Sequence, residues 1–197
     1  MEKLTLTAEH FNENSEYIGK ADVTNFNGDI EIAANLGYVI FEEIKASGFI
    51  CAMSGSGIEA GRGIEAGRGI EAGSGIEAGR GIEAGRGIKA GSGIKAGSGI
   101  EAGWGIEAGR GIKAGRGIFC RLEINVSLRI FAGLCSWRLP SDEEREITCG
   151  KLSSGVVCYG ILIEIGIDDH ASDSDLATNM ERITIDGVEY NLTPIDS

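Results

Sequence analysis

A six-residue unit, Gly-x-Gly-Ile-Glu/Lys-Ala, repeats without insertion over residues 55–117 and restricts what this chain can fold into. Its isoleucines recur every six residues from Ile58 to Ile118. One unit is too short to bury its own apolar side chain, whereas stacked units bury theirs together. The repeat therefore predicts a solenoid.

The chemistry of the unit predicts which kind of solenoid forms. In Ile58-Glu59-Ala60 apolar and charged side chains alternate, which is the two-residue period of a strand. The glycines between triplets predict corners with backbone angles that other residues avoid. An α-helix is excluded because two glycines per unit cost about 2 kcal/mol relative to alanine. Collagen is excluded because glycine does not occupy every third position. Three-residue strands joined at corners form a β-helix.

The residue between the two glycines predicts the length of one coil. In the first half of the repeat this position reads Ser-Arg-Arg twice, so every third unit returns to the same corner. Three units, or 18 residues, then close a triangular coil, with neighbouring strands about 4.8 Å apart. The predicted corner ladders are Ser56-Ser74-Ser92, Arg68-Arg86-Trp104 and Arg62-Arg80-Ser98-Arg116. Glu65, Glu83 and Glu101 stack as like charges, which flanking arginines make tolerable.

The predicted fold class is all-β, a single-stranded β-helix with a small α+β cap at its C-terminal end. We predict three segments: a leader or cap over residues 1–21, the solenoid over 22–136 with regular units over 55–120, and a capping or dimerisation segment over 137–197. Less regular triplets extend the solenoid in both directions. They are Ile30-Glu31-Ile32, Leu36-Gly37-Tyr38, Ile44-Lys45-Ala46, Ile50-Cys51-Ala52, Ile124-Asn125-Val126 and Ile130-Phe131-Ala132.

The C-terminal segment carries helix and turn signals. Ser141 before three acidic residues is typical of a helix start, and a second short helix is predicted near residues 176–182. Alternating apolar residues around Asp186-Gly187 predict a β-hairpin over 183–190.

Residues 156–165 are the most apolar stretch of the chain and are predicted to form a buried strand. This strand either covers the end of the solenoid or pairs with a second copy, giving a homodimer. The residues predicted to mediate self-association are Val156, Ile161, Ile163 and Ile165.

The formal net charge is −12, and its distribution limits the partners. Residues 55–120 carry seven Glu against nine Lys and Arg, so the acidity lies in the two ends. Direct nucleic-acid binding is disfavoured by the overall sign, and phosphate mimicry by the solenoid is disfavoured by its near neutrality. Mimicry by an acidic end stays open, with Asp168, Asp169, Asp173 and Asp175 as candidates. A cation site there is the less favoured alternative to a solvated loop.

No catalytic, cofactor or metal site is predicted. Acyltransferase β-helices place a catalytic histidine on a coil, but His10 and His170 both lie outside the repeat. Glycine spacing like that of a nucleotide-binding loop recurs along the whole repeat and never opens a strand-to-helix turn. The five cysteines lack paired CxxC spacing, and Cys120 occupies the alanine position of its unit. A polar N-terminus and the lack of a long apolar run predict a cytoplasmic protein without a membrane segment.

Trp104 is the most distinctive surface residue, because the other ten corners of the repeat hold only Ser or Arg. We predict that its ring lies over Arg86, one coil earlier, in a cation–π contact. Arg68, Arg86 and Trp104 also have the composition of a protein–protein hot spot, which makes them the candidate partner-binding residues.

The units Gly-Arg-Gly-Ile-Glu-Ala and Gly-Ser-Gly-Ile-Lys-Ala resemble those of bactofilin-type β-helix proteins. Near-perfect units between acidic ends also resemble phage-encoded anti-CRISPR inhibitors. The second resemblance implies a non-catalytic protein that binds a CRISPR effector nuclease in the bacterial cytoplasm and blocks its activity. The first implies a self-assembling scaffold, although bactofilins carry short tails and a valine-rich core. We expect the inhibitor, with the scaffold as the alternative.

Overall fold

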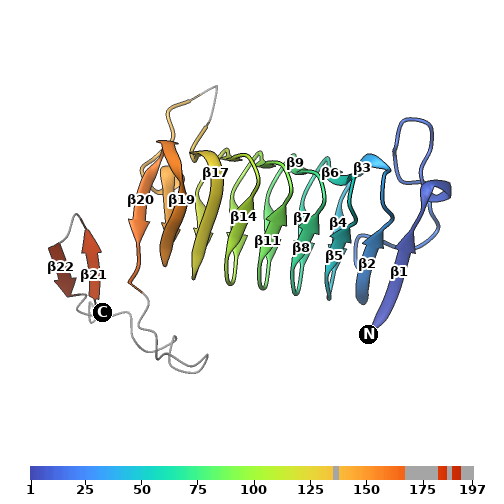
Figure 1. Cartoon of the computed structure of the whole chain (residues 1–197), viewed down its shortest axis with the longest axis horizontal. Helices are drawn as coiled ribbons and strands as arrows, with labels where there is room; N and C mark the ends of the chain where they lie inside the picture. Colours follow the sequence, from blue (N-terminus) through green and yellow to red (C-terminus); the bar gives the residue numbers. More distant parts are fainter. Residues whose placement is uncertain (135–137, 167–181, 186–187, 192–197) are drawn as a thin grey trace.

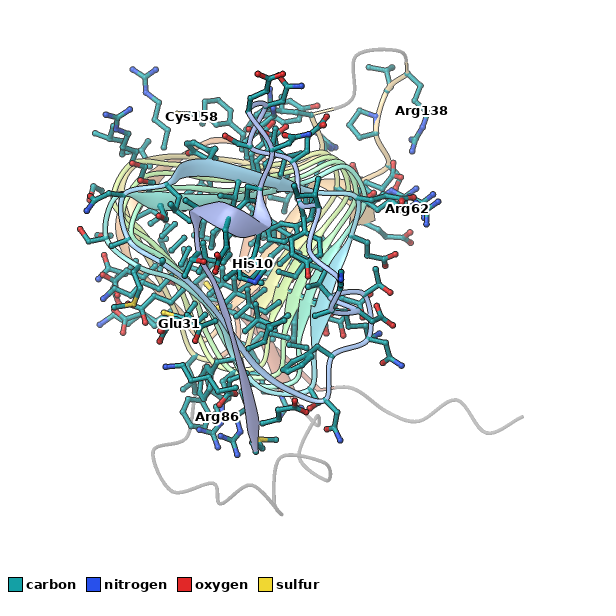
Figure 2. All side chains as sticks on the ribbon, turned by 90° about the vertical axis from the view of Figure 1, so that its right-hand side faces the viewer. His10, Glu31, Arg62, Arg86, Arg138 and Cys158 are labelled. Carbon is teal, nitrogen blue, oxygen red and sulfur yellow. The ribbon has the colours of Figure 1, made fainter. Side chains whose placement is uncertain are left out.

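The computed structural model describes residues 1–134 and 138–166, with the backbone of 182–185 and 188–191. The chain forms a parallel β-solenoid of about seven turns, whose coils stack along one axis (Figure 1). Seen along that axis, each coil surrounds an apolar core, and charged side chains project outward from it (Figure 2). The predicted β-helix is therefore confirmed.

Three ladders of parallel strands form the sides of the solenoid. The first side contains β1 (Glu2–Leu6), β2 (Gly28–Ile32), β5 (Ile50–Ala52), β8 (Ile70–Ala72), β11 (Ile88–Ala90) and β14 (Ile106–Ala108). The second contains β3 (Gly37–Phe41), β6 (Ser56–Ala60), β9 (Ile76–Ala78), β12 (Ile94–Ala96) and β15 (Ile112–Ala114). The third contains β4 (Ile44–Ala46), β7 (Ile64–Ala66), β10 (Ile82–Ala84), β13 (Ile100–Ala102), β16 (Ile118–Cys120), β18 (Glu146–Cys149) and β20 (Ile161–Glu164). β17 (Glu123–Phe131) runs along both the first and second sides, and β19 (Lys151–Tyr159) pairs with it.

Strand register confirms the predicted coil of about 18 residues. Ile76 lies opposite Ile58 on one neighbouring strand and opposite Ile94 on the other. The N-terminal coils are slightly longer, because Ile50 pairs with Ile30 and with Ile70, which are each two positions further away than the regular units would place them.

Side chains alternate in and out as predicted. Every Ile and Ala of the strands from Ile58 to Ala114 is at most 5 % exposed, whereas the Glu or Lys between them points outward. Cys120 pairs with Ala102 and is buried, so it fills an alanine position as expected. Burial of each isoleucine contributes roughly 1.5–3 kcal/mol, which makes the core the main source of stability.

The glycines serve a different purpose from the predicted one. Between residues 57 and 117 no glycine has a positive φ, so the corners do not need unusual backbone angles. Instead, the first glycine of most units lies against the coil before it. A Cβ on Gly79 would lie 2.1 Å from the carbonyl oxygen of Gly61, a separation that real Cβ atoms do not show. Close coil stacking is therefore what requires glycine.

One N-terminal triplet was assigned wrongly. β3 points Val39 and Phe41 inward, while Tyr38 is exposed and Leu36 is half-buried before the strand. The sequence offers two overlapping alternations here, and Asn35, with a positive φ, turns the chain before the strand begins.

Residues 156–165 form strands that cover the preceding coils, but the prediction of one buried strand is wrong. Gly160, with φ of +135°, separates β19 from β20, and both lie in the last described coil (Figure 1). Leu152 and Val157 pack against the core, whereas Val156 is 62 % exposed. The outward side chains lie at the end of the solenoid and have no further coil among the described residues to cover them.

The helical part of the predicted α+β cap is wrong within the described residues, which contain no α-helix. Ser141 precedes a single 3-10 turn, η2 (Glu143–Arg145), and a similar turn, η1 (Ala8–His10), follows β1. The second helix falls largely on residues 176–181, outside the described residues. The hairpin is confirmed, because β21 (Arg182–Ile185) and β22 (Val188–Asn191) pair antiparallel with Ile185 opposite Val188.

Candidate partner-binding surface

Arg68, Arg86 and Trp104 occupy one corner of three successive coils, between the third and first sides. The backbone N–H of Trp104 donates to the carbonyl oxygen of Arg86 at 2.9 Å, and that of Leu122 donates to the carbonyl of Trp104 at 2.7 Å. The N–H of Arg86 likewise donates to the carbonyl of Arg68. Figure 2 shows Arg86 projecting from a different corner than Arg62. The predicted corner ladder is present, and we call these three residues the Trp104 corner.

Trp104 is 49 % exposed, yet its ring does not lack a partner. The guanidinium carbon of Arg86 lies 4.9 Å from the ring centroid, so the predicted cation–π contact is confirmed. Such a contact contributes about 0.5–1 kcal/mol at an exposed site. Its main effect here is to hold a large apolar surface in one orientation.

Arg68 has an aromatic partner that the sequence did not indicate. Its guanidinium carbon lies 5.6 Å from the centre of the Phe49 ring. Phe49 was missed because its coil is longer than the regular ones, so the spacing of the repeat does not align it with the corner. The signal that could have identified it is Ser47-Gly48-Phe49, where phenylalanine stands in place of the second corner glycine.

A groove runs along the first side of the solenoid beside this corner. It has a volume of about 440 Å³ and is lined by both Phe49 and Trp104, with Arg86 between them. Its charged lining includes Glu71, Lys89, Glu107 and Glu123, and Lys89 pairs with Glu107 at 3.1 Å. The groove therefore combines two exposed rings with charges of both signs.

The other two sides carry grooves of similar volume but different character. The groove on the third side, about 430 Å³, is lined by Glu65, Glu83, Glu101, Arg80 and Phe119. Strand register confirms the predicted ladder of these three glutamates, and Glu65 pairs with Lys45. The groove on the second side, about 460 Å³, is lined mainly by polar and charged residues together with Tyr38. The three grooves have similar volumes. The groove on the first side differs from the other two because two aromatic rings, Phe49 and Trp104, line it.

The remaining predicted partner-binding and self-association residues do not join this surface. Asp168, Asp169, Asp173 and Asp175 lie outside the described residues. Val156, Ile161, Ile163 and Ile165 lie on or beside β19 and β20 in the last described coil. The structure thus separates a corner surface from an end surface.

Cys120, Cys149 and His10 are residue types that can act as nucleophiles or metal ligands, but here each is buried or hydrogen-bonded within the chain. Burial raises the pKa of Cys120 to about 12 and that of Cys149 to about 11, so both thiols stay protonated at neutral pH. Nδ1 of His10 accepts a hydrogen bond from the backbone N–H of Thr7 at 3.1 Å.

Within residues 1–134 and 138–166 no three His, Cys, Asp or Glu side chains gather to hold a metal ion. In the described part of the chain, no helix has the length and apolar content needed to span a bilayer.

A scan against family models, a search of curated proteins and a search of solved structures each returned no match to this chain.

Proposed function

We propose that this chain is a non-catalytic protein-binding solenoid that contacts its partner through the Trp104 corner and the adjoining groove. The observation that carries the proposal is the exposed Trp104 ring held at 4.9 Å by Arg86. Trp and Arg are the residue types most enriched among side chains that dominate binding energy. A ring that is already oriented loses little conformational freedom when a partner covers it.

The solenoid backbone supports this proposal. Each strand of the repeat pairs on both sides with strands of neighbouring coils, so the corner is mounted on a rigid frame. A partner would recognise a preformed surface, and we expect the interface backbone to move little on binding.

The specific form that we propose is an anti-defence inhibitor, in which the partner is a CRISPR effector nuclease. This form rests on the resemblance of the repeat, between its acidic ends, to anti-CRISPR inhibitors. The test is to add the purified chain to a panel of reconstituted CRISPR effector complexes and follow cleavage of a labelled target DNA. We expect one effector type to lose activity at an equimolar ratio. Full activity of every effector type at large molar excess would contradict the anti-defence form.

The alternative function is a self-assembling scaffold of bactofilin type. The exposed apolar side chains of β19 and β20 favour it, because no further coil among the described residues covers them. End-to-end growth of a filament, however, needs an association surface at both ends of each subunit. The N-terminal end of this solenoid is covered by residues 11–23 of its own chain.

A further inference from the structure

The row of corner residues that contains Trp104 continues to the last described coil. The backbone N–H of Leu122 donates to the carbonyl oxygen of Trp104 at 2.7 Å, and that of Lys151 donates to the carbonyl oxygen of Leu122 at 2.8 Å. Arg121 lies directly before Leu122, and both Arg121 and Lys151 are exposed. Two further cationic side chains therefore follow the Trp104 corner, beyond its own two arginines.

We call the four cationic residues of this row the basic stripe; they are Arg68, Arg86, Arg121 and Lys151. Within residues 1–134 and 138–166, none of them forms an ion pair with a carboxylate. The chain as a whole carries −12, so carboxylates are abundant in it. The charges of the stripe are nevertheless left for a partner to neutralise.

The row of corner residues that begins with Arg62 differs from the basic stripe. Arg62 pairs with Glu42 at 3.0 Å, and Arg116 pairs with Glu144 at 3.7 Å. Both ends of that row are therefore neutralised by the chain itself. Arginine at a corner of the repeat does not by itself give an unpaired row of cations.

Aromatic rings hold two of the guanidinium groups of the stripe in place. The guanidinium carbon of Arg86 lies 4.9 Å from the centre of the Trp104 ring, and that of Arg68 lies 5.6 Å from the centre of the Phe49 ring. A guanidinium group that stacks on a ring keeps the N–H donors at its edge, and these donors match the geometry of a carboxylate. Because the ring already orients the group, less conformational freedom is lost when an anion binds.

The surroundings of the stripe favour carboxylates over the phosphates of nucleic acid. The groove beside the corner is lined by Glu71, Glu107 and Glu123. A continuous row of phosphates along the corner would run beside these glutamates, on a chain whose net charge is −12. The carboxylates of a polypeptide can be separated by neutral and apolar residues, which suit the exposed ring of Trp104.

We propose that the basic stripe binds an acidic, extended segment of the partner protein, with carboxylates on the stripe and an apolar side chain on Trp104. This inference rests on the proposed function, because that function places the partner on Arg86 and Trp104, which lie in the middle of the row. It adds the chemical nature of the partner segment and extends the contact to Arg121 and Lys151.

The length of the row sets the length of the segment. Successive corner positions lie about 4.8 Å apart, so the row from Arg68 to Lys151 spans about 19 Å. An extended segment of about six residues covers this length. Three of its side chains then face the solenoid, since alternate side chains of an extended chain point to the same side.

The test measures binding of a fluorescein-labelled peptide to the full chain by fluorescence anisotropy, without any nuclease. The peptide has about twelve residues, twice the length needed, and alternates glutamate with serine around one central leucine. A control peptide carries glutamine in place of each glutamate. We expect only the glutamate peptide to bind, and its affinity should fall as the salt concentration rises.

The extension of the contact is tested with Arg121→Glu and Lys151→Glu together, which lie outside the Trp104 corner. This variant should bind the glutamate peptide at least about tenfold more weakly, because two attractive charges become repulsive. The matched control is Arg110→Glu with Lys113→Glu, which makes the same change of charge in the groove on the second side and should bind within about twofold of wild type. If the circular dichroism spectrum shows that charge reversal impairs folding, Arg121→Gln with Lys151→Gln should still weaken binding at least about threefold.

Four results would overturn the proposal. Equal binding of the glutamate and glutamine peptides, or binding of neither, would show that the stripe does not take carboxylates. Unchanged binding by the folded Arg121→Glu, Lys151→Glu variant would place the contact elsewhere. Tighter binding of a single-stranded oligonucleotide than of the peptide would assign the stripe to nucleic acid. Binding at least about tenfold tighter in a further variant would show that the chain's own aspartates occupy the stripe; its changes are Asp168→Asn, Asp169→Asn, Asp173→Asn and Asp175→Asn.

Failure of this inference and failure of the proposed function are distinguishable. A chain that inhibits an effector nuclease through Trp104 but does not bind the glutamate peptide would overturn the inference alone. A chain that binds the peptide but inhibits no effector would overturn the anti-defence form alone.

Discussion

A Cβ atom added to Gly97 would lie 2.1 Å from the carbonyl oxygen of Gly79, one coil earlier. The second glycine of most units is less confined. A Cβ on Gly81 would meet its nearest neighbour, the carbonyl oxygen of Gly99, at 3.5 Å, which is ordinary van der Waals contact. The two glycines of the unit are therefore not equivalent, although the sequence writes them alike.

This difference gives the first prediction. Gly97→Ala should lower the free energy of unfolding by about 2–3 kcal/mol, because the neighbouring backbone must shift to admit the methyl group. Gly81→Ala should change it by less than about 1 kcal/mol, since alanine also restricts the unfolded chain. Urea unfolding of both variants checks the prediction, and equal destabilisation would contradict the asymmetry.

The second prediction compares neighbouring residues on one strand. Ala84 is 2 % exposed, so Ala84→Asp should bury an unpaired charge and destabilise the middle coils by about 3 kcal/mol or more. Glu83 points outward between Glu65 and Glu101, so Glu83→Ala should cost little and relieves like-charge contact. Thermal melts of the two variants should separate clearly, and similar melting temperatures would mean that the inward face was assigned wrongly.

The third prediction concerns the pH dependence of stability. The pKa of Cys120 rises from its ordinary value of 9.0 to about 12 in the folded chain, chiefly because of burial. Its contribution is fully present below pH 9 and is lost between pH 9 and 12, since only the unfolded chain ionises there. The loss is at most about 1.4 kcal/mol per pH unit. Cys120→Ala restores the repeat residue and should remove this part of the slope. Denaturant unfolding at pH 8 and 10.5 checks it, and identical slopes in both proteins would contradict it.

The fourth prediction concerns the C-terminal coil. Truncation after Leu139 removes β18, β19 and β20, which cover β16 and β17. The buried residues Ile118 and Ile130 should then lie at an open end, and we expect the truncated chain to aggregate. Light scattering and circular dichroism of the truncated chain measure this. A soluble, fully folded truncated chain would show that these strands do not protect the solenoid.

The regular coils could be predicted from the sequence because each strand has only three residues and its inward positions are fixed by alternation. The pairing of Ile58 with Ile76 and the contact between Arg86 and Trp104 both follow from the three-unit spacing. Irregular coils could not be predicted in this way. The coil that contains Phe49 is two residues longer than a regular coil, so the 18-residue spacing does not align Phe49 with Arg68. At β3 the sequence contains two overlapping alternations of apolar residues, and only one of them faces the core.

The surface could be predicted only in part. The Trp104 corner was identified by composition, but the groove beside it depends on Phe49 and on side chains from several coils. The last described coil was predicted to contain one buried strand, because apolar composition does not reveal whether another coil follows. The glycine at position 160 was the only local sign in the sequence that the apolar stretch is interrupted. In the structure Gly160 has a φ of +135°, which favours glycine, and it separates β19 from β20.

The proposed function is tested most directly at the Trp104 corner. The measurement is the concentration of chain needed to inhibit the sensitive effector nuclease by half, for wild type and for Trp104→Ala with Arg86→Glu. The matched control is Phe119→Ala with Arg80→Glu, which removes a ring and reverses a charge in the groove on the third side. We expect the first variant to keep its melting temperature and to need at least about thirtyfold more chain, as for loss of an interface anchor worth about 2 kcal/mol. The control should inhibit like wild type. A Trp104→Ala, Arg86→Glu variant that inhibits as well as wild type would contradict the proposal that this corner binds the partner.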